Sequence, residues 1–151
     1  MRVLVYDCSA GISGDMNLAA LIDLGADRDI LERELSKLNV HGEWKLECRR
    51  AAQAGIHGTR VDVLAHEHGH SGHSHEHHHR TMADIRRIIT ESELPDAVQK
   101  TALSIFSLLA EAEAHVHGTT PDQVHFHEVG AVDSIIDIVG AAICLDLLRA
   151  D

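Results

Sequence analysis

The sequence lacks several features that would assign it to familiar classes. Its 151 residues include three cysteines, Cys8, Cys48 and Cys144, but no CxxC pair, which excludes a thiolate zinc knuckle and argues against a disulfide framework. Aromatic residues make up 3% of the chain, so its core must be aliphatic. No apolar run is long enough to span a membrane, and the chain begins with a strand pattern where a secreted protein would have a signal peptide. We therefore expect a single cytoplasmic domain that does not enter a membrane.

Basic residues are scarce as well. There are 13 Lys and Arg residues against 24 Asp and Glu residues, which gives a formal net charge of −11. A protein that binds nucleic acid needs a basic surface, so we expect no nucleic-acid partner. The acidic excess suits a protein that attracts cations, although a solvated surface that aids solubility would give the same balance.

Histidine, in contrast, is abundant, with 14 residues, and more than half of them lie in one tract. Imidazole binds Zn, Cu, Fe and Ni in its neutral form. A His-rich tract with almost no apolar residue therefore predicts a flexible, metal-binding loop at residues 66–80. An expression tag is the alternative, but Ser, Gly and Glu interrupt the tract and it lies in mid-chain. The predicted ligands are His66, His68, His70, His73, His75, His77, His78 and His79.

The periodicity predicts an α/β or α+β fold, with a small sheet of three or four strands packed with about five helices. The continuous apolar run Val3–Tyr6 predicts a buried strand. Two further segments, 44–48 and 60–64, alternate as half-buried strands do, and we expect them to pair. Cap residues and apolar stripes predict helices near 13–25, 27–38, 81–94, 96–117 and 130–147.

A second group of histidines lies in the segment 124–128. If this segment is extended, His125 and His127 point to one side and the intervening apolar residues point to the core. A strand of this kind can aim two imidazoles at one ion, and Glu128 can reach the same place. The alternative is a pair of surface histidines on an edge strand.

His115 and His117 lie at the predicted end of a helix, just before Gly118. Residues two apart on a helix diverge by about 200°, so both can bind one ion only where the helix ends. Each histidine also lies four residues after a glutamate. A favourable interaction of protonated histidine with the helix dipole explains these positions without a metal.

Asp133 and Asp137 are four residues apart on the last predicted helix. Gly130 and Gly140 lie on roughly the same side, which would leave room for an ion or a ligand. The alternative is that both carboxylates face water and that Asp133 interacts with the helix dipole.

The loop from Asp7 to Asp15 follows a predicted strand and opens a helix, a position where backbone N–H groups bind anions. A Walker lysine and a GxGxxG pattern are missing, and the two aspartates would repel a phosphate unless a cation intervened. A metal or metal–nucleotide site is therefore preferred, with a simple strand–helix turn as the alternative. The predicted cofactor-binding residues are Ser9, Gly11, Ser13 and Gly14, and the catalytic candidates are Asp7, Cys8, Asp15 and Glu128.

Two stretches, DCSAGISGDM at residues 7–16 and VHFHEVGAVDSIIDIVG at residues 124–140, together with the intervening His-rich insertion, resemble the LarC nickel-insertion proteins. The resemblance covers essentially the whole chain. It implies a nickel chelatase that inserts nickel into pyridinium-3,5-bisthiocarboxylic acid mononucleotide, forms a nickel–carbon bond and hydrolyses CTP. The product is the nickel-pincer cofactor of lactate racemase. Ser9 departs from the family pattern, which has Phe after the cysteine.

The resemblance also implies that the family continues beyond residue 151 and binds CTP, with Mg²⁺ or Mn²⁺, in that C-terminal region. Residues 1–151 would then be a single N-terminal nickel-handling domain that does not complete the reaction alone. We expect the missing C-terminal region and the mononucleotide as partners, and a homo-oligomer.

The residues and the resemblance agree on a divalent metal, since Ni²⁺ suits imidazole with some carboxylate. We expect the tract at 66–79 to collect nickel and the loop from Asp7 to Asp15 to receive the nucleotide phosphate or a second cation. The alternatives are a nickel or zinc storage or metallochaperone module, a metal-dependent hydrolase and a structural subunit. The residues expected to hold nickel for transfer are His125, His127 and Glu128, with Asp133, Asp137, His115 and His117.

Overall fold

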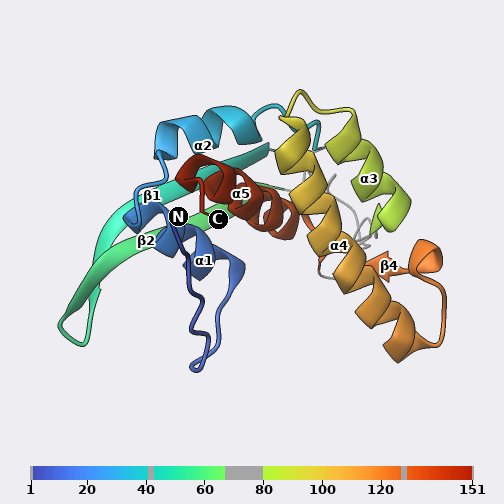
Figure 1. Cartoon of the computed structure of the whole chain (residues 1–151), viewed down its shortest axis with the longest axis horizontal. Helices are drawn as coiled ribbons and strands as arrows, with labels where there is room; N and C mark the ends of the chain where they lie inside the picture. The colour runs from blue at the N-terminus through green and yellow to red at the C-terminus, as the bar shows by residue number, and fades with distance from the viewer. Residues whose placement is uncertain (1, 41–42, 67–79, 127–128, 151) are drawn as a thin grey trace, which may run out of the picture.

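The computed structural model describes residues 2–40, 43–66, 80–126 and 129–150 (Figure 1). The fold is α+β, one of the two predicted classes, and its described strands form two separate antiparallel pairs, β1–β2 and β3–β4, in place of the single small sheet expected. In chain order the elements are α1 (Gly14–Asp23), α2 (Arg28–Leu35), β1 (Glu43–Gln53), β2 (Ile56–His66), β3 (Arg80–Thr81), α3 (Met82–Thr90), α4 (Asp96–His117), the 3₁₀ turn η1 (Pro121–Gln123), β4 (His125–Phe126) and α5 (Val132–Leu148).

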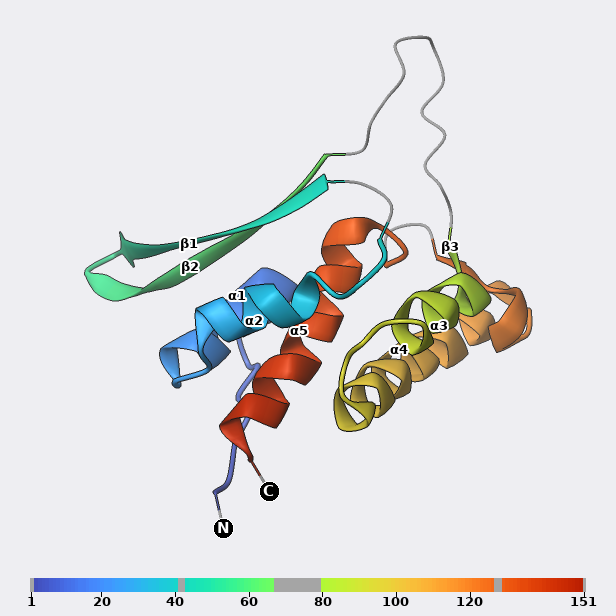
Figure 2. The same cartoon turned by 90° about the horizontal axis from the view of Figure 1, so that it is seen from above.

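Helix α5 is the centre of the core. Its side chains are buried on several faces, because α1, α2 and β2 pack on one side of it and α4 packs on the other. Figures 1 and 2 show α5 between these two groups, with α3 on the outer side of α4. A helix that is apolar nearly all round is expected to be enclosed in this way. Among the helices that the structure describes, none combines the length and apolar character needed to cross a membrane.

Local signals in the sequence correctly predict the starts of α2 and α3 and the end of α4, while α2 and α3 end earlier than predicted, at Leu35 and Thr90. The Asp27 carboxylate accepts a hydrogen bond from the backbone N–H of Ile30 at the start of α2. Thr81 and Asp84 form a reciprocal capping box at the start of α3, as the threonine and the acidic residue three positions later predict. Gly118 ends α4 in the left-handed conformation, with φ +63°.

The β1–β2 hairpin is longer than the alternating segments predicted. Its last pair is Gln53 with Ile56, so only Ala54 and Gly55 form the turn. Both turn residues have positive φ, 51° and 81°, as a tight two-residue hairpin turn requires. The hairpin extends beyond the helices at its turn end (Figure 2).

The hairpin is held to α1 by buried and polar contacts. Leu46 and Val61 are buried in the common core. At the end of α1, Asp23 accepts hydrogen bonds from the Thr59 backbone at 2.8 Å, from the Thr59 hydroxyl at 2.7 Å and from the Arg50 guanidinium at 2.8 Å. These three bonds hold the pKa of Asp23 below its usual range, with the Thr59 hydroxyl as the largest cause.

The predicted buried strand at Val3–Tyr6 is wrong for this chain. The segment carries no strand pairing in the part of the chain that the structure describes. Val3, Val5 and Tyr6 are 61%, 79% and 49% exposed, and Leu4 alone among these four packs against the core. An apolar run signals a tendency to be buried in a sheet, but it does not supply the neighbouring strands. Here β1 and β2 pair with each other and leave the segment without a ladder.

Candidate functional site

The loop between Asp7 and Asp15 is a compact turn before α1. The backbone N–H of Gly11 donates to the carbonyl oxygen of Cys8 at 2.9 Å, and Gly11 has a φ of +83° that favours glycine. The backbone N–H of Ser9 donates to the Asp7 carboxylate at 3.2 Å. The side chains of this turn are exposed. Solvent therefore reaches the side chains of residues 7–13, while Asp15 is half-buried.

Ser13 begins α1 in a different way from the one expected. It occupies the N-cap position, but its hydroxyl donates to the carboxylate of Asp15 and does not accept from a helical N–H. The first N–H groups of α1 are thus left without a side-chain cap. The positive end of the helix dipole and the ionisable carboxyl group of Asp15 lie together at this helix start.

Helices α1 and α5 meet closely at Gly14 and Asp137. A Cβ on Gly14 would lie 2.2 Å from Oδ2 and 2.6 Å from Cβ of Asp137, so only glycine fits there. Burial, together with the smaller effects of the charges of Asp15 and Asp133, raises the pKa of Asp137 to about 7. Asp137 therefore exchanges a proton near neutral pH, which is typical of functional carboxyl groups.

Two polar oxygen atoms in this region are buried without a hydrogen-bond partner among the described residues: Oδ1 of Asp137 and Oδ1 of Asn17. Asn17 lies three positions after Gly14 and therefore on the same face of α1. The Asn17 side chain also forms a hydrogen bond with the Tyr6 hydroxyl, and partial burial raises the pKa of Tyr6. Both unpartnered oxygens are acceptors, so this interhelical region could take a donor or a cation.

The glycine-lined side of α5 is not the open space that the sequence suggested. A Cβ on Gly140 would lie 3.0 Å from the Leu18 side chain of α1. At Gly130 it would lie 2.9 Å from the Phe126 carbonyl oxygen and 3.3 Å from Cβ of Arg80. Both glycines allow close packing, and among the described residues of this helix face the unpartnered buried oxygen is Oδ1 of Asp137.

The alternation predicted for the histidine strand is confirmed in the described residues. Val124 and Phe126 are buried, while His125 on β4 is exposed. Phe126 packs edge-on against Phe106 of α4, with the ring centroids 6.3 Å apart. The buried face fixes the strand and leaves the imidazole of His125 free to meet a ligand.

The β3–β4 pair connects the two predicted histidine regions. Arg80, the first described residue after the His-rich tract, pairs with Phe126, and Thr81 pairs with His125. Arg80 also donates from its guanidinium to the carbonyl oxygen of Gly130 at 2.6 Å. Residues 67–79, His127 and Glu128 lie outside the described residues, as do the surroundings of the His66 side chain.

His115 and His117 lie in the last turn of α4, and both are exposed. The His117 imidazole lies 3.2 Å from the carboxylate of Glu113, one turn earlier. This contact fits the interpretation of His117 as a surface residue of the helix end. Across the described ranges, no group of three or more His, Cys, Asp or Glu side chains is placed to share one ion.

The three cysteines are free and lie at different depths. Cys8 is exposed and Cys48 is half-buried. Cys144 is buried in α5, and this burial raises the pKa of its thiol to about 12. Cys144 is therefore a small core residue, and Cys8 is the accessible thiol near the loop.

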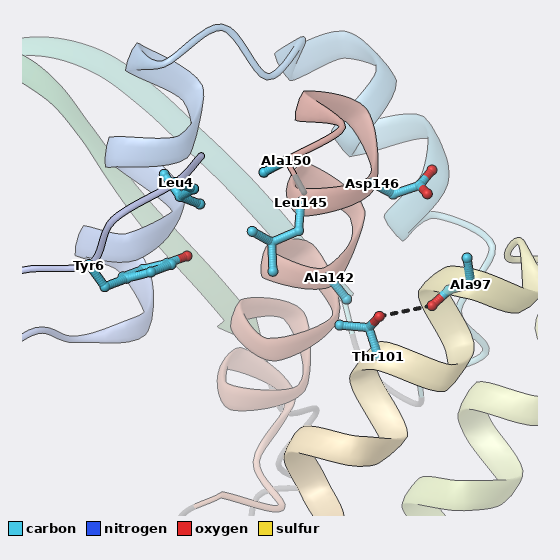
Figure 3. Close-up of a pocket in the computed structure, with 8 residues that line it drawn as sticks. All are labelled: Leu4, Tyr6, Ala97, Thr101, Ala142, Leu145, Asp146 and Ala150. Carbon is cyan, nitrogen blue, oxygen red and sulfur yellow. Dashed lines mark hydrogen bonds between the residues drawn. The ribbon is translucent and has the colours of Figure 1, made fainter. Parts of the chain in front are cut away.

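A pocket of about 380 Å³ that no sequence motif marks lies between the N-terminal segment, α4 and α5 (Figure 3). Residues from distant parts of the chain form its wall, so neither their spacing nor their type reveals it. Its lining residues are Leu4, Tyr6, Ala97, Thr101, Ala142, Leu145, Asp146 and Ala150.

Comparison with known protein families matches residues 4–151 to the family described as nickel insertion protein. The chain belongs to this family. A pyridinium-3,5-bisthiocarboxylic acid mononucleotide nickel insertion protein of Akkermansia muciniphila is 78% identical over 151 residues. The protein of the same name from Clostridium kluyveri is 54% identical over 155 residues, and a putative nickel insertion protein of Roseiflexus castenholzii is 52% identical over 150 residues.

This member of the nickel insertion family spans only part of its relatives' length. The matches cover 99–100% of the chain but 36–39% of these three relatives. The chain corresponds to their N-terminal portion. No solved structure matches it.

Proposed function

We propose that this chain is the nickel-binding part of an enzyme that inserts nickel into pyridinium-3,5-bisthiocarboxylic acid mononucleotide. Two of the relatives described above carry names with this activity, one of them at 78% identity. The structural observation that carries the proposal is the β3–β4 pair. It joins the end of the His-rich tract to the strand that presents His125.

Nickel is the substrate of this reaction, so a site that captures it must also release it. We assign capture to the tract at 66–79, where many imidazoles offer alternative ligand sets. His125, His127 and Glu128 then hold the ion for transfer, with His115, His117, Asp133 and Asp137 as further candidate ligands. The exposure of His125 and the pairing of Arg80 with Phe126 support a short path between the two groups.

The start of α1 is our candidate for the nucleotide or for a second cation. The uncapped N–H groups of α1 would favour a phosphate, with Ser9, Gly11, Ser13 and Gly14 as the surrounding residues. The unpartnered oxygens of Asp137 and Asn17 support a cation or a donor group there. The candidates for a direct catalytic role remain Asp7, Cys8, Asp15 and Glu128.

The complete reaction is expected to need the longer protein. We place CTP, with Mg²⁺ or Mn²⁺, in the portion that the relatives have beyond this chain, and we expect the 151 residues alone to be inactive as a lyase. A cytoplasmic location and a homo-oligomeric state belong to the same proposal.

Nickel titration by calorimetry tests the assignment. In one variant every histidine of residues 67–79 is replaced by serine, which keeps the loop length. In a second, His125 and His127 are replaced by alanine. The first variant should lower the nickel stoichiometry and keep a tight site, and the second should weaken the tight site about tenfold or more.

His57→Ala is the matched control, because His57 is exposed on the hairpin and belongs to neither histidine group. It should titrate like the parent chain. If the tight site survives the loss of His125 and His127, the assignment of the holding site is wrong. If the variant with serine in place of every histidine of residues 67–79 binds no nickel at all, the chain is better described as a storage module.

A further inference from the structure

The N-terminal segment, residues 3–7, has the alternating pattern of a strand but no neighbouring strand within the described ranges. Its apolar side chains alternate: Leu4 and Tyr6 line the pocket against α5, while Val3 and Val5 are 61% and 79% exposed. Alternate residues of an extended chain lie on opposite faces. One face of the segment therefore lines the pocket, with Leu4 packed on the core and Tyr6 half exposed, and the other face presents apolar surface to solvent. Exposed apolar strands with free backbone groups are normally paired or covered.

The segment runs antiparallel to α5. The Arg2 guanidinium donates to the carbonyl oxygen of Leu148 at 2.6 Å, at the end of the helix. Further along the segment, Tyr6 lines the pocket with Ala142, about two turns earlier on the helix. Helix α5 thus returns the chain to the point where the segment starts, and the two ends lie side by side in Figures 1 and 2.

The end of α5 directs the chain towards the same pocket. Arg149 caps the helix in the left-handed conformation, with φ 48° and ψ 48°. Ala150, the next residue, lines the pocket together with Leu4. A chain that continued from here would start next to residue 2. Because α5 runs antiparallel to residues 3–7, a strand that follows α5 and reverses its direction would run parallel to residues 3–7. This is the common arrangement of two strands joined by a helix.

We propose that the residues that follow position 151 in the longer relatives form a strand parallel to residues 3–7. The C-terminal part of the longer protein then covers Val3 and Val5. The match to 37% of the Akkermansia muciniphila relative leaves ample chain for this role. The surface is thus an interface with the rest of the same polypeptide. This inference concerns assembly of the protein, and it does not depend on which residues bind nickel.

Amide hydrogen exchange provides the first test. It compares the 151-residue chain with the same chain extended by the residues that follow the match in the Akkermansia muciniphila relative. Residues 3–7 should exchange freely in the short chain and about 100-fold or more slowly in the extended one, because ladder hydrogen bonds protect amides. Equal exchange in both proteins would overturn the proposal.

Two valines of nearly equal exposure give a matched pair of variants. Val5 is 79% exposed in the proposed interface, and Val116 is 77% exposed near the end of α4. Val5→Lys and Val116→Lys should each leave the melting temperature of the short chain unchanged. In the extended protein, Val5→Lys should lower the melting temperature by about 5 °C or more, because it buries a charge, while Val116→Lys should have no effect.

Sedimentation of the short chain separates the proposed occupant from a second copy. If the short chain dimerises with residues 3–7 protected, a second copy occupies the surface and the proposal is wrong. Equal effects of the two lysine variants in the extended protein would also contradict it. A monomeric short chain with an unprotected segment, together with protection in the extended protein, would support it.

Discussion

The first and second halves of the stretch at residues 124–140 are used differently in the fold. The first half forms a short strand that presents His125 on one side and buries Phe126 on the other. The second half enters α5, where Gly140 packs against Leu18 and Asp137 lies against Gly14. The comparison shows that one continuous sequence motif can place some residues at the surface and others, a few turns later, in close contact between helices. Gly140 of the motif allows the close contact between α1 and α5, Gly130 lies against Phe126 and Arg80 of the β3–β4 pair, and His125 remains exposed.

The largest expected effect tests the close-packed region. Gly14→Ala places a methyl group 2.2 Å from a carboxylate oxygen of Asp137, so α1 and α5 must separate. We expect a loss of about 2–3 kcal/mol in the free energy of unfolding, as overpacked cores show. Denaturant unfolding followed by circular dichroism measures it.

Gly58→Ala is the control for that experiment, because a Cβ there would meet only Asp23 at 3.6 Å, an ordinary contact. Its stability should stay within about 0.5 kcal/mol of the parent. Combining Gly14→Ala with Asp137→Gly should recover part of the loss, since both the carboxylate and its Cβ cause the clash. A stable Gly14→Ala protein would show that the helix contact is looser than described.

The next effect concerns the charge of Asp137. Burial, with the neighbouring charges of Asp15 and Asp133, raises its pKa from the ordinary value of 3.8 to about 7, so the folded state favours the protonated carboxyl. The protonated Asp137 carboxyl therefore makes its full contribution to the free energy of unfolding below about pH 4. This contribution falls as the pH rises towards 7 and is lost above it. Asp137→Asn should be more stable than the parent above pH 7 by about 1–2 kcal/mol, after discounting for solvent screening. The difference should shrink towards pH 4.

Thermal unfolding of both proteins between pH 4 and pH 8 measures this difference. Asp133→Asn is a useful comparison, because Asp133 lies on the same helix but is exposed. It should change the pH profile much less than Asp137→Asn. If the difference in stability between the parent and Asp137→Asn does not change between pH 4 and pH 8, the raised pKa is contradicted.

The smallest effect tests the strand region. Thr81→Ala removes one half of the capping box at the junction of β3 and α3 and should cost about 1 kcal/mol. Thr101→Ala is the control, because the Thr101 hydroxyl donates to a carbonyl oxygen within α4, and loss of such a bond costs little. Urea unfolding compares the two variants. Equal destabilisation would show that the capping box does not set the start of α3.

Much of this fold follows from short-range signals. The caps at Asp27 and Thr81 and the termination at Gly118 are local, so the sequence predicts these helix ends well. The alternation around Phe126 is local too. Each of these features depends on residues within one or two turns of one another, and their physical cause is already present in the peptide.

The features that the sequence did not predict depend on contacts between distant segments. The run at residues 3–6 predicted a buried strand, but burial needs a neighbouring strand that the described residues do not provide. The glycine side of α5 suggested open space because nothing in the sequence places Leu18 against Gly140. The approach of Gly14 to Asp137 brings together residues more than a hundred positions apart, and it creates the most perturbed carboxyl group of the site.

The graded depth of the three sulfur atoms has a practical consequence. An alkylating reagent at neutral pH should modify Cys8 first, because its sulfur is exposed, and should leave Cys144 intact in the folded chain. The natural chain therefore offers a preferred attachment point for a fluorophore or a spin label close to the start of α1. Such a label would report directly on events in that loop without any change to the sequence.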